Sequence, residues 1–182
     1  MVETISPSEL RQEAERAYKK KDYLSAAKSY QAAAECYSQP GEQITAAELL
    51  NNASVAYLQA GEPESALQAT LDTEITFSEA GDTRRQAIAL GNQAAAYEAL
   101  GQLESAAQAY ETSSELLKKI DDQELRSVVM QSLSAVQLRL GNKMEALVTM
   151  QAGLEQIENP GFKQKLVKKI LRSPFSYFNR LT

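Results

Sequence analysis

Apolar and small side chains recur at spacings of three and four along most of the chain, with polar residues between them. Between residues 42 and 60 they fall on one helical face, from Ala46 and Leu49 to Tyr57 and Ala60. This spacing is typical of an amphipathic helix. The pattern, interrupted at intervals, predicts helices over roughly 7–20, 23–38, 42–60, 63–80, 83–100, 103–119, 122–140, 143–158 and 162–172.

Glycine and proline mark the ends of these helices. Gly61 follows one predicted helix, and Pro63 falls in the first turn of the next. Glycine adopts the left-handed C-terminal cap without steric cost, and proline suits a first helical turn because its missing N–H is not needed there. Ser6-Pro7-Ser8-Glu9 has the pattern of a capping box. The short connections predict helical hairpins.

The hairpins repeat with a period of 40 residues. One small residue recurs in the second helix of each unit: Ala26, Ala66, Ala106 and Ala146. A fixed period of this size predicts a solenoid, in which each unit buries its apolar face on its neighbours. We therefore expect an all-α, right-handed α-solenoid of four hairpins, over about 7–41, 42–81, 82–121 and 122–160, followed by a tail at 161–182.

A small side chain is expected where the two helices of a hairpin cross closely. The first helices offer matching small residues at the same period: Ala14, Ser54, Ala94 and Ser134. We predict that Ala66 and Ala106 are buried at these crossings. A leucine at either position would overpack the crossing, at a cost of about 1–3 kcal/mol.

The composition argues against catalysis. The chain has no histidine and a single cysteine, Cys36. Histidine is the commonest general base and the commonest metal ligand. Gly-rich phosphate loops, nucleophile elbows and paired-cysteine metal patterns do not occur in the sequence. We expect no enzyme activity, no metal and no cofactor.

The charge is unevenly distributed. Residues 161–182 contain six basic and no acidic side chains, which leaves 13 basic and 24 acidic ones in the rest of the chain. An acidic body argues against duplex nucleic acid as a partner, because phosphate binding needs clustered lysine and arginine. The sequence contains no apolar run long enough to span a bilayer and no signal-peptide pattern. We expect a cytoplasmic protein.

The third repeat carries Ala94-x2-Tyr97-x3-Gly101-x4-Ala106-x3-Tyr110, a pattern that resembles tetratricopeptide (TPR) repeats. Those repeats have a period of 34 residues, so the units of this chain are longer. Longer units resemble the repeats of kinesin light chains and of spindle-orientation adaptors that bind G-protein α subunits. Leu50-Asn51-Asn52-Ala53 and Leu90-Gly91-Asn92-Gln93 are close to the first-helix motif of those families. The resemblance covers residues 7–158.

The resemblance implies a concave groove lined by the first helices. The residues expected to face it are Arg11, Asn51, Asn52, Asn92 and Gln131. Asn52 and Asn92 share one register, and their amides would pair with the main chain of an extended peptide. In the alternative, they bond to neighbouring helices or to water. Gly91, which costs ~1 kcal/mol in mid-helix, favours the approach of another backbone.

A carboxylate clamp needs several basic side chains on the groove surface. The sequence suggests three candidates: Arg11, Lys19 and Arg139. Arg139 lies three repeats away from the other two, so we expect no binding of an acidic C-terminal tail.

The basic tail allows three interpretations. In residues 162–172, Phe162, Leu166 and Ile170 follow one stripe, and the basic residues gather opposite. This pattern predicts a helix that caps the last repeat by packing on 143–158, because solenoid ends require covering. It also suits a helix on anionic lipid. Alternatively, aromatic residues 175–178 dock in a groove of the same or a second molecule. The candidate contact residues are Phe162, Lys165, Lys168, Lys169, Phe175 and Phe178.

These features together predict a protein-interaction module. We expect an adaptor, scaffold or co-chaperone-like protein that holds a peptide or protein segment in the TPR groove. The alternative function is a membrane-surface assembly or targeting factor that acts through the tail. The tail is also a candidate contact with a second copy of the chain.

Overall fold

The computed structural model describes residues 6–37 and 41–155, and the described part is 84% helical with no strand. The all-α prediction is confirmed. The described helices are α1 (Pro7–Lys19), α2 (Tyr23–Glu35), α3 (Gln43–Ala60), α4 (Pro63–Thr70), α5 (Thr73–Glu79), α6 (Thr83–Ala99), α7 (Leu103–Lys119), α8 (Gln123–Arg139) and α9 (Lys143–Glu155). The helix expected at 162–172 lies outside the described residues.

Side chains cap several of the described helices. Ser6 and Glu9 form the expected capping box at the start of α1, with the Ser6 N–H donating to Glu9 Oε2 at 2.8 Å. Asp82 and Asp122 accept from backbone N–H groups in the first turns of α6 and α8. Gly61 ends α3 at φ 79°, in the left-handed region that favours glycine. The local sequence therefore accounts for these helix ends.

The second helix of repeat two differs from the prediction. A single helix was expected over 63–80, but α4 and α5 are separated by Leu71 in an extended conformation and Asp72 at φ 62°. Tyrosine or methionine occupies the place of Thr70 in the other three repeats. The Thr70 hydroxyl donates to the Leu67 carbonyl at 2.8 Å, and the Thr73 hydroxyl donates to the Thr70 carbonyl at 2.9 Å. Threonine hydroxyls that bond to the backbone in this way compete with regular helix geometry.

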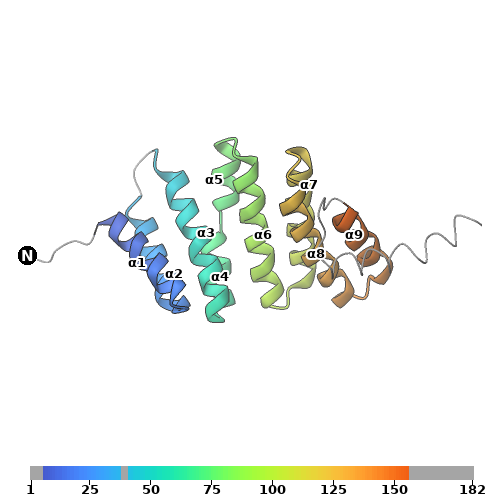
Figure 1. The fold of residues 1–182 in the computed structure, drawn as a ribbon, viewed down its shortest axis with the longest axis horizontal. Coiled ribbons are helices and arrows are strands. Elements are labelled where there is room, and N and C mark those ends of the chain that lie inside the picture. The colour runs from blue at the N-terminus through green and yellow to red at the C-terminus, as the bar shows by residue number, and fades with distance from the viewer. Residues whose placement is uncertain (1–5, 38–40, 156–182) are drawn as a thin grey trace, which may run out of the picture.

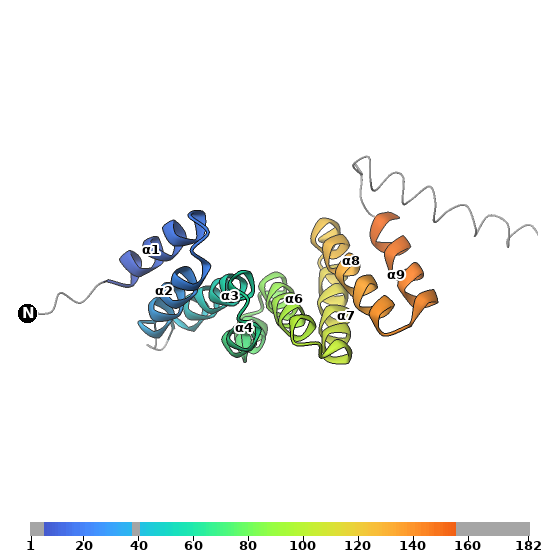
Figure 2. The ribbon, with the colours of Figure 1, turned by 90° about the horizontal axis from the view of Figure 1, so that it is seen from below.

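The hairpins follow one another along the longest axis of the molecule, from α1 at one end to α9 at the other (Figures 1 and 2). Most helices pack on the next helix along the chain, and α3 and α4 also contact α6 of the following repeat. The repeated alanines Ala26, Ala66 and Ala106 are fully buried, as are Ala14, Ser54, Ala94 and Ser134 opposite them. This confirms the predicted burial of Ala66 and Ala106.

Polar contacts between adjacent repeats join residues about one period apart. Arg84 Nε lies 2.9 Å from Asp122 Oδ2, and Arg139 Nη1 lies 3.0 Å from Glu98 Oε1. The arginine of each pair is exposed and its carboxylate is only partly covered, so each pair contributes ~1 kcal/mol or less to stability. The buried apolar core, which includes Leu49, Leu117 and the repeated alanines, therefore contributes more to the stability of the stack than these ion pairs do. No helix in the described ranges has the length and hydropathy needed to cross a bilayer.

Candidate functional site

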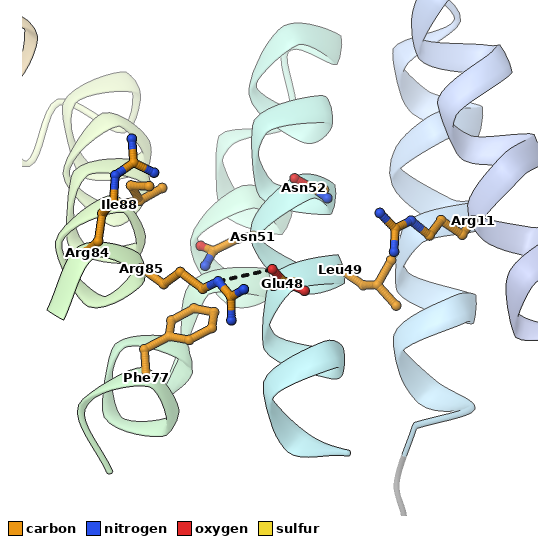
Figure 3. A pocket seen from close by; sticks show the side chains of 9 residues that line it. All are labelled: Arg11, Glu48, Leu49, Asn51, Asn52, Phe77, Arg84, Arg85 and Ile88. Atoms are coloured by element: carbon orange, nitrogen blue, oxygen red, sulfur yellow. Dashed lines mark ion pairs between the residues drawn. The ribbon is translucent and has the colours of Figure 1, made fainter. Parts of the chain in front are cut away.

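An open pocket of about 270 Å³ lies along three successive first helices, α1, α3 and α6. Leu49 and Phe77, which are both 1% exposed, contribute apolar lining. Polar side chains surround them, as Figure 3 shows: Arg11 from α1, Glu48, Asn51 and Asn52 from α3, and Arg84 and Arg85 from α6. The pocket therefore spans the first three repeats on the side where the sequence predicts a groove.

Two adjacent asparagines of α3 have different environments. Asn51 is 7% exposed, and its Oδ1 accepts a hydrogen bond of 3.4 Å from Nδ2 of Asn92 on α6. Asn52 is exposed, and no hydrogen bond engages its side chain within the described part of the chain. The structure therefore joins Asn51 to Asn92 across the repeats. Asn52 offers a free amide to a ligand.

The structure places the other expected groove residues in two locations. Arg11 lines the pocket with Asn51 and Asn52. Gln131 is exposed on α8, where its Nε2 donates to Ser127 Oγ at 3.3 Å. It does not line this pocket.

Arg84 and Arg85 were missed in the search for basic groove residues. They occupy the first turn of α6 and line the pocket with Arg11. Residues 84, 88 and 92 are spaced by four and share one helix face. Arg84 lies eight residues before Asn92 on this face, so the same helical spacing that selected Asn92 also indicates Arg84. The expectation that Arg11, Lys19 and Arg139 are the only candidate basic side chains on this surface is therefore wrong, because Arg84 and Arg85 also line the pocket.

Each of the three guanidinium groups already has a carboxylate partner. Arg11 Nε lies 3.2 Å from Glu15, Arg84 Nε lies 2.9 Å from Asp122, and Arg85 Nε lies 3.1 Å from Glu48. Each positive charge at the pocket therefore has a negative charge beside it. The arginine side chains are 42–61% exposed. A ligand carboxylate can replace one of these partners at a small cost in free energy, because surface ion pairs are weak.

The chemistry of the lining suits binding. Amide, guanidinium and carboxylate groups around an apolar floor can hold a peptide segment by hydrogen bonds and ion pairs. Across residues 6–37 and 41–155, no three side chains of the metal-ligating types gather to hold an ion. The expected tail contacts, Phe162, Lys165, Lys168, Lys169, Phe175 and Phe178, lie outside the described residues.

Comparison with known proteins supports the helical-repeat fold. The structure is similar to the crystal structure of BtubC (BKLC) from P. vanneervenii, with a TM-score of 0.73 and 15% sequence identity. The similarity covers 94% of this chain and 74% of that one. At this identity the likeness concerns the fold. The finer resemblance to kinesin light chains and spindle-orientation adaptors stays a prediction.

A family match covers most of the sequence. No curated protein matches the chain. The sequence profile of the family described as soluble NSF attachment protein, SNAP, matches residues 6–173. This range includes all four hairpins and extends into the basic tail. The chain belongs to the soluble NSF attachment protein family.

Proposed function

We propose that the chain is a non-enzymatic adaptor that holds a segment of a partner protein in the pocket along α1, α3 and α6. Its family and fold are those of interaction modules, which supports an adaptor role. The observation that carries the proposal is the free, exposed amide of Asn52 beside three exposed arginines.

The pocket fits an extended segment of mixed charge. Asn52 can donate to and accept from a peptide main chain, which does not depend on the side chains of the ligand. Arg11 and Arg84, on either side of Asn52 (Figure 3), can pair with acidic side chains of the ligand, and Glu48 can pair with a basic one. The hydrogen bond to Asn92 fixes Asn51 and thus helps to hold α3 and α6 in place.

The family description names NSF as the protein to which such chains attach. We propose NSF, or its counterpart in the organism of this chain, as the first partner to test. The tail provides the alternative function at a membrane surface, because its basic residues and apolar stripe suit anionic lipid.

The test uses the full chain as bait, both for the purified NSF counterpart and for lysate of the native host. We expect Asn52→Ala to weaken binding of the retained protein by about 1–3 kcal/mol, because the ligand loses its hydrogen-bond partner. Gln108→Ala, which removes an exposed amide on α7, is the matched control and should bind like wild type. Equal affinity of wild type and Asn52→Ala would place the binding site elsewhere. Binding to anionic vesicles without a protein partner would favour the alternative.

A further inference from the structure

The last hairpin has an unusually apolar outer surface. Leu138 of α8 is 48% exposed. Met144, Leu147 and Val148 of α9 are 68%, 38% and 56% exposed. These four are among ten large apolar side chains that are exposed in the described part of the chain, so the last hairpin carries a large share of them. We call them the α8–α9 surface. Burial of so much apolar area is favourable, which indicates a binding surface.

The repeat register explains part of this exposure. Leu58 and Leu67 of repeat two stand in the places of Leu138 and Leu147 in repeat four, 80 residues later. Both are partly buried against a core cluster that includes Ala96 of the following repeat. Leu138 and Leu147 therefore lie on the face that a following hairpin covers elsewhere in the stack. At the end of the described chain, this face needs another cover.

Met144 and Val148 are not explained by stacking. The equivalent residues in repeats two and three are Glu64 and Glu104, and Gln68 and Gln108. All four are exposed and polar. Only the last repeat replaces both with apolar side chains. Whatever covers the α8–α9 surface must therefore also reach the outer side of α9.

The chain itself supplies a segment with the required chemistry. Helix α9 ends at Glu155, and 27 further residues follow. Residues 156–161 include Asn159-Pro160-Gly161, which suits a reversal of direction between two antiparallel helices. In the next eleven residues, Phe162, Leu166 and Ile170 follow one helical stripe. The family match extends through this segment to residue 173.

The charges near α9 are complementary to this segment. Burial raises the pKa of the Glu111 carboxyl, and the neighbouring carboxylates of Glu145 and Glu115 raise it further. These acidic groups on α7 and α9 lie close enough to repel one another. Residues 162–172 carry five basic side chains and no acidic one, so a segment docked nearby would relieve the repulsion.

We propose that residues 162–172 of the same chain dock as an amphipathic helix on the α8–α9 surface. Phe162, Leu166 and Ile170 cover the exposed apolar side chains, and the basic residues lie beside the acidic groups of α7 and α9. The segment closes the open end of the solenoid and extends around the outer side of α9.

Limited proteolysis of the full chain tests this docking, because trypsin cleaves after the basic residues of the segment. In wild type, cleavage after Lys165, Lys168 and Lys169 should be at least about tenfold slower than in an isolated peptide of residues 160–182, since docked backbone is cut only when it opens. Mass spectrometry of early time points gives the rates.

Two sets of variants disrupt the contact from opposite sides. Met144→Glu with Val148→Gln restores the side chains that repeat three carries at the same places. Leu166→Glu with Ile170→Glu removes the apolar stripe without touching the described hairpins. Each pair should accelerate tail cleavage about tenfold, and the combination should add little, because both remove one contact. Gln108→Glu, at an equally exposed position on α7, should leave the rate unchanged, and circular dichroism checks helicity.

Three results would overturn the proposal. Rapid cleavage of the wild-type tail, as in the free peptide, would show that the segment is not docked. Protection that grows with protein concentration and accompanies dimers in sedimentation would assign the cover to a second copy. Protection that requires anionic vesicles would assign the segment to a membrane.

Discussion

Two buried serines show how equivalent positions can differ at the scale of single residues. Ser54 and Ser134 occupy the same place in repeats two and four, and both are fully buried. The Ser134 hydroxyl donates to the Ala146 carbonyl at 2.8 Å. The Ser54 hydroxyl is buried without a hydrogen-bond partner among the described residues. Repeats one and three have Ala14 and Ala94 at this place. Alanine therefore fits the crossing, and the Ser54 hydroxyl only costs desolvation energy.

We predict opposite effects of the same substitution at these two sites. Ser54→Ala should raise the free energy of unfolding by about 1 kcal/mol, because it removes an unsatisfied buried hydroxyl and adds helix propensity. Ser134→Ala should lower it by about 0.5–1.5 kcal/mol, because a buried hydrogen bond is lost. Urea unfolding of both variants measures the difference. A destabilised Ser54→Ala would show that the hydroxyl has a partner, such as a bound water.

At the scale of helices, two glycines within helical segments face different surroundings. A Cβ atom added at Gly91 of α6 would meet Ser113 Oγ at 3.7 Å, an ordinary contact. A Cβ atom added at Gly153 of α9 would lie 3.0 Å from Met130 Cβ. Room for a methyl group at Gly91 shows that the chain itself brings no backbone close to it. Gly153, in contrast, is required by the close packing of α9 on α8.

This difference predicts which glycine can be replaced. Gly91→Ala should raise the free energy of unfolding by about 0.5–1 kcal/mol, the usual gain when alanine replaces glycine in a helix. Gly153→Ala gains the same propensity but overpacks Met130, so we expect it to be net destabilising by about 1 kcal/mol. Thermal and urea unfolding of the pair provide the measurement. Equal stabilisation by both variants would mean that α9 shifts away from α8 without cost.

At the scale of the whole molecule, stability is expected to vary along the stack. Helix α3 packs against α2, α4, α5 and α6, whereas the main contacts of α1 within the described residues are with α2 alone. In a solenoid each unit is stabilised by its neighbours, so an end helix opens more easily than an internal one.

We therefore predict that amide hydrogens of α3 and α6 exchange at least about tenfold more slowly than those of α1. Hydrogen–deuterium exchange of the full chain, analysed by peptide, measures this gradient. The peptides of α7 serve as an internal reference, because this helix also lies within the stack. Uniform protection from α1 to α9 would indicate that the described helices unfold as one cooperative unit.

The sequence by itself determined most of the helices, their pairing into hairpins and the positions of the small buried side chains. Capping residues and apolar spacing act within a few residues, and the 40-residue period repeats the same local solution, as the buried Ala66 and Ala106 illustrate. Asn52, which lines the pocket, was also among the residues that the TPR resemblance predicted for a groove.

Only the tertiary structure decided which side chains of neighbouring repeats meet. The pairing of Asn51 with Asn92 and the entry of Arg84 into the pocket depend on how α3 and α6 lie against each other. The break between α4 and α5 was also seen only in the structure, where the Thr70 and Thr73 hydroxyls bond to nearby backbone carbonyls and the predicted single helix does not continue. Local pattern fixes each helix, but the contacts between residues one repeat apart are set by the packing of whole helices.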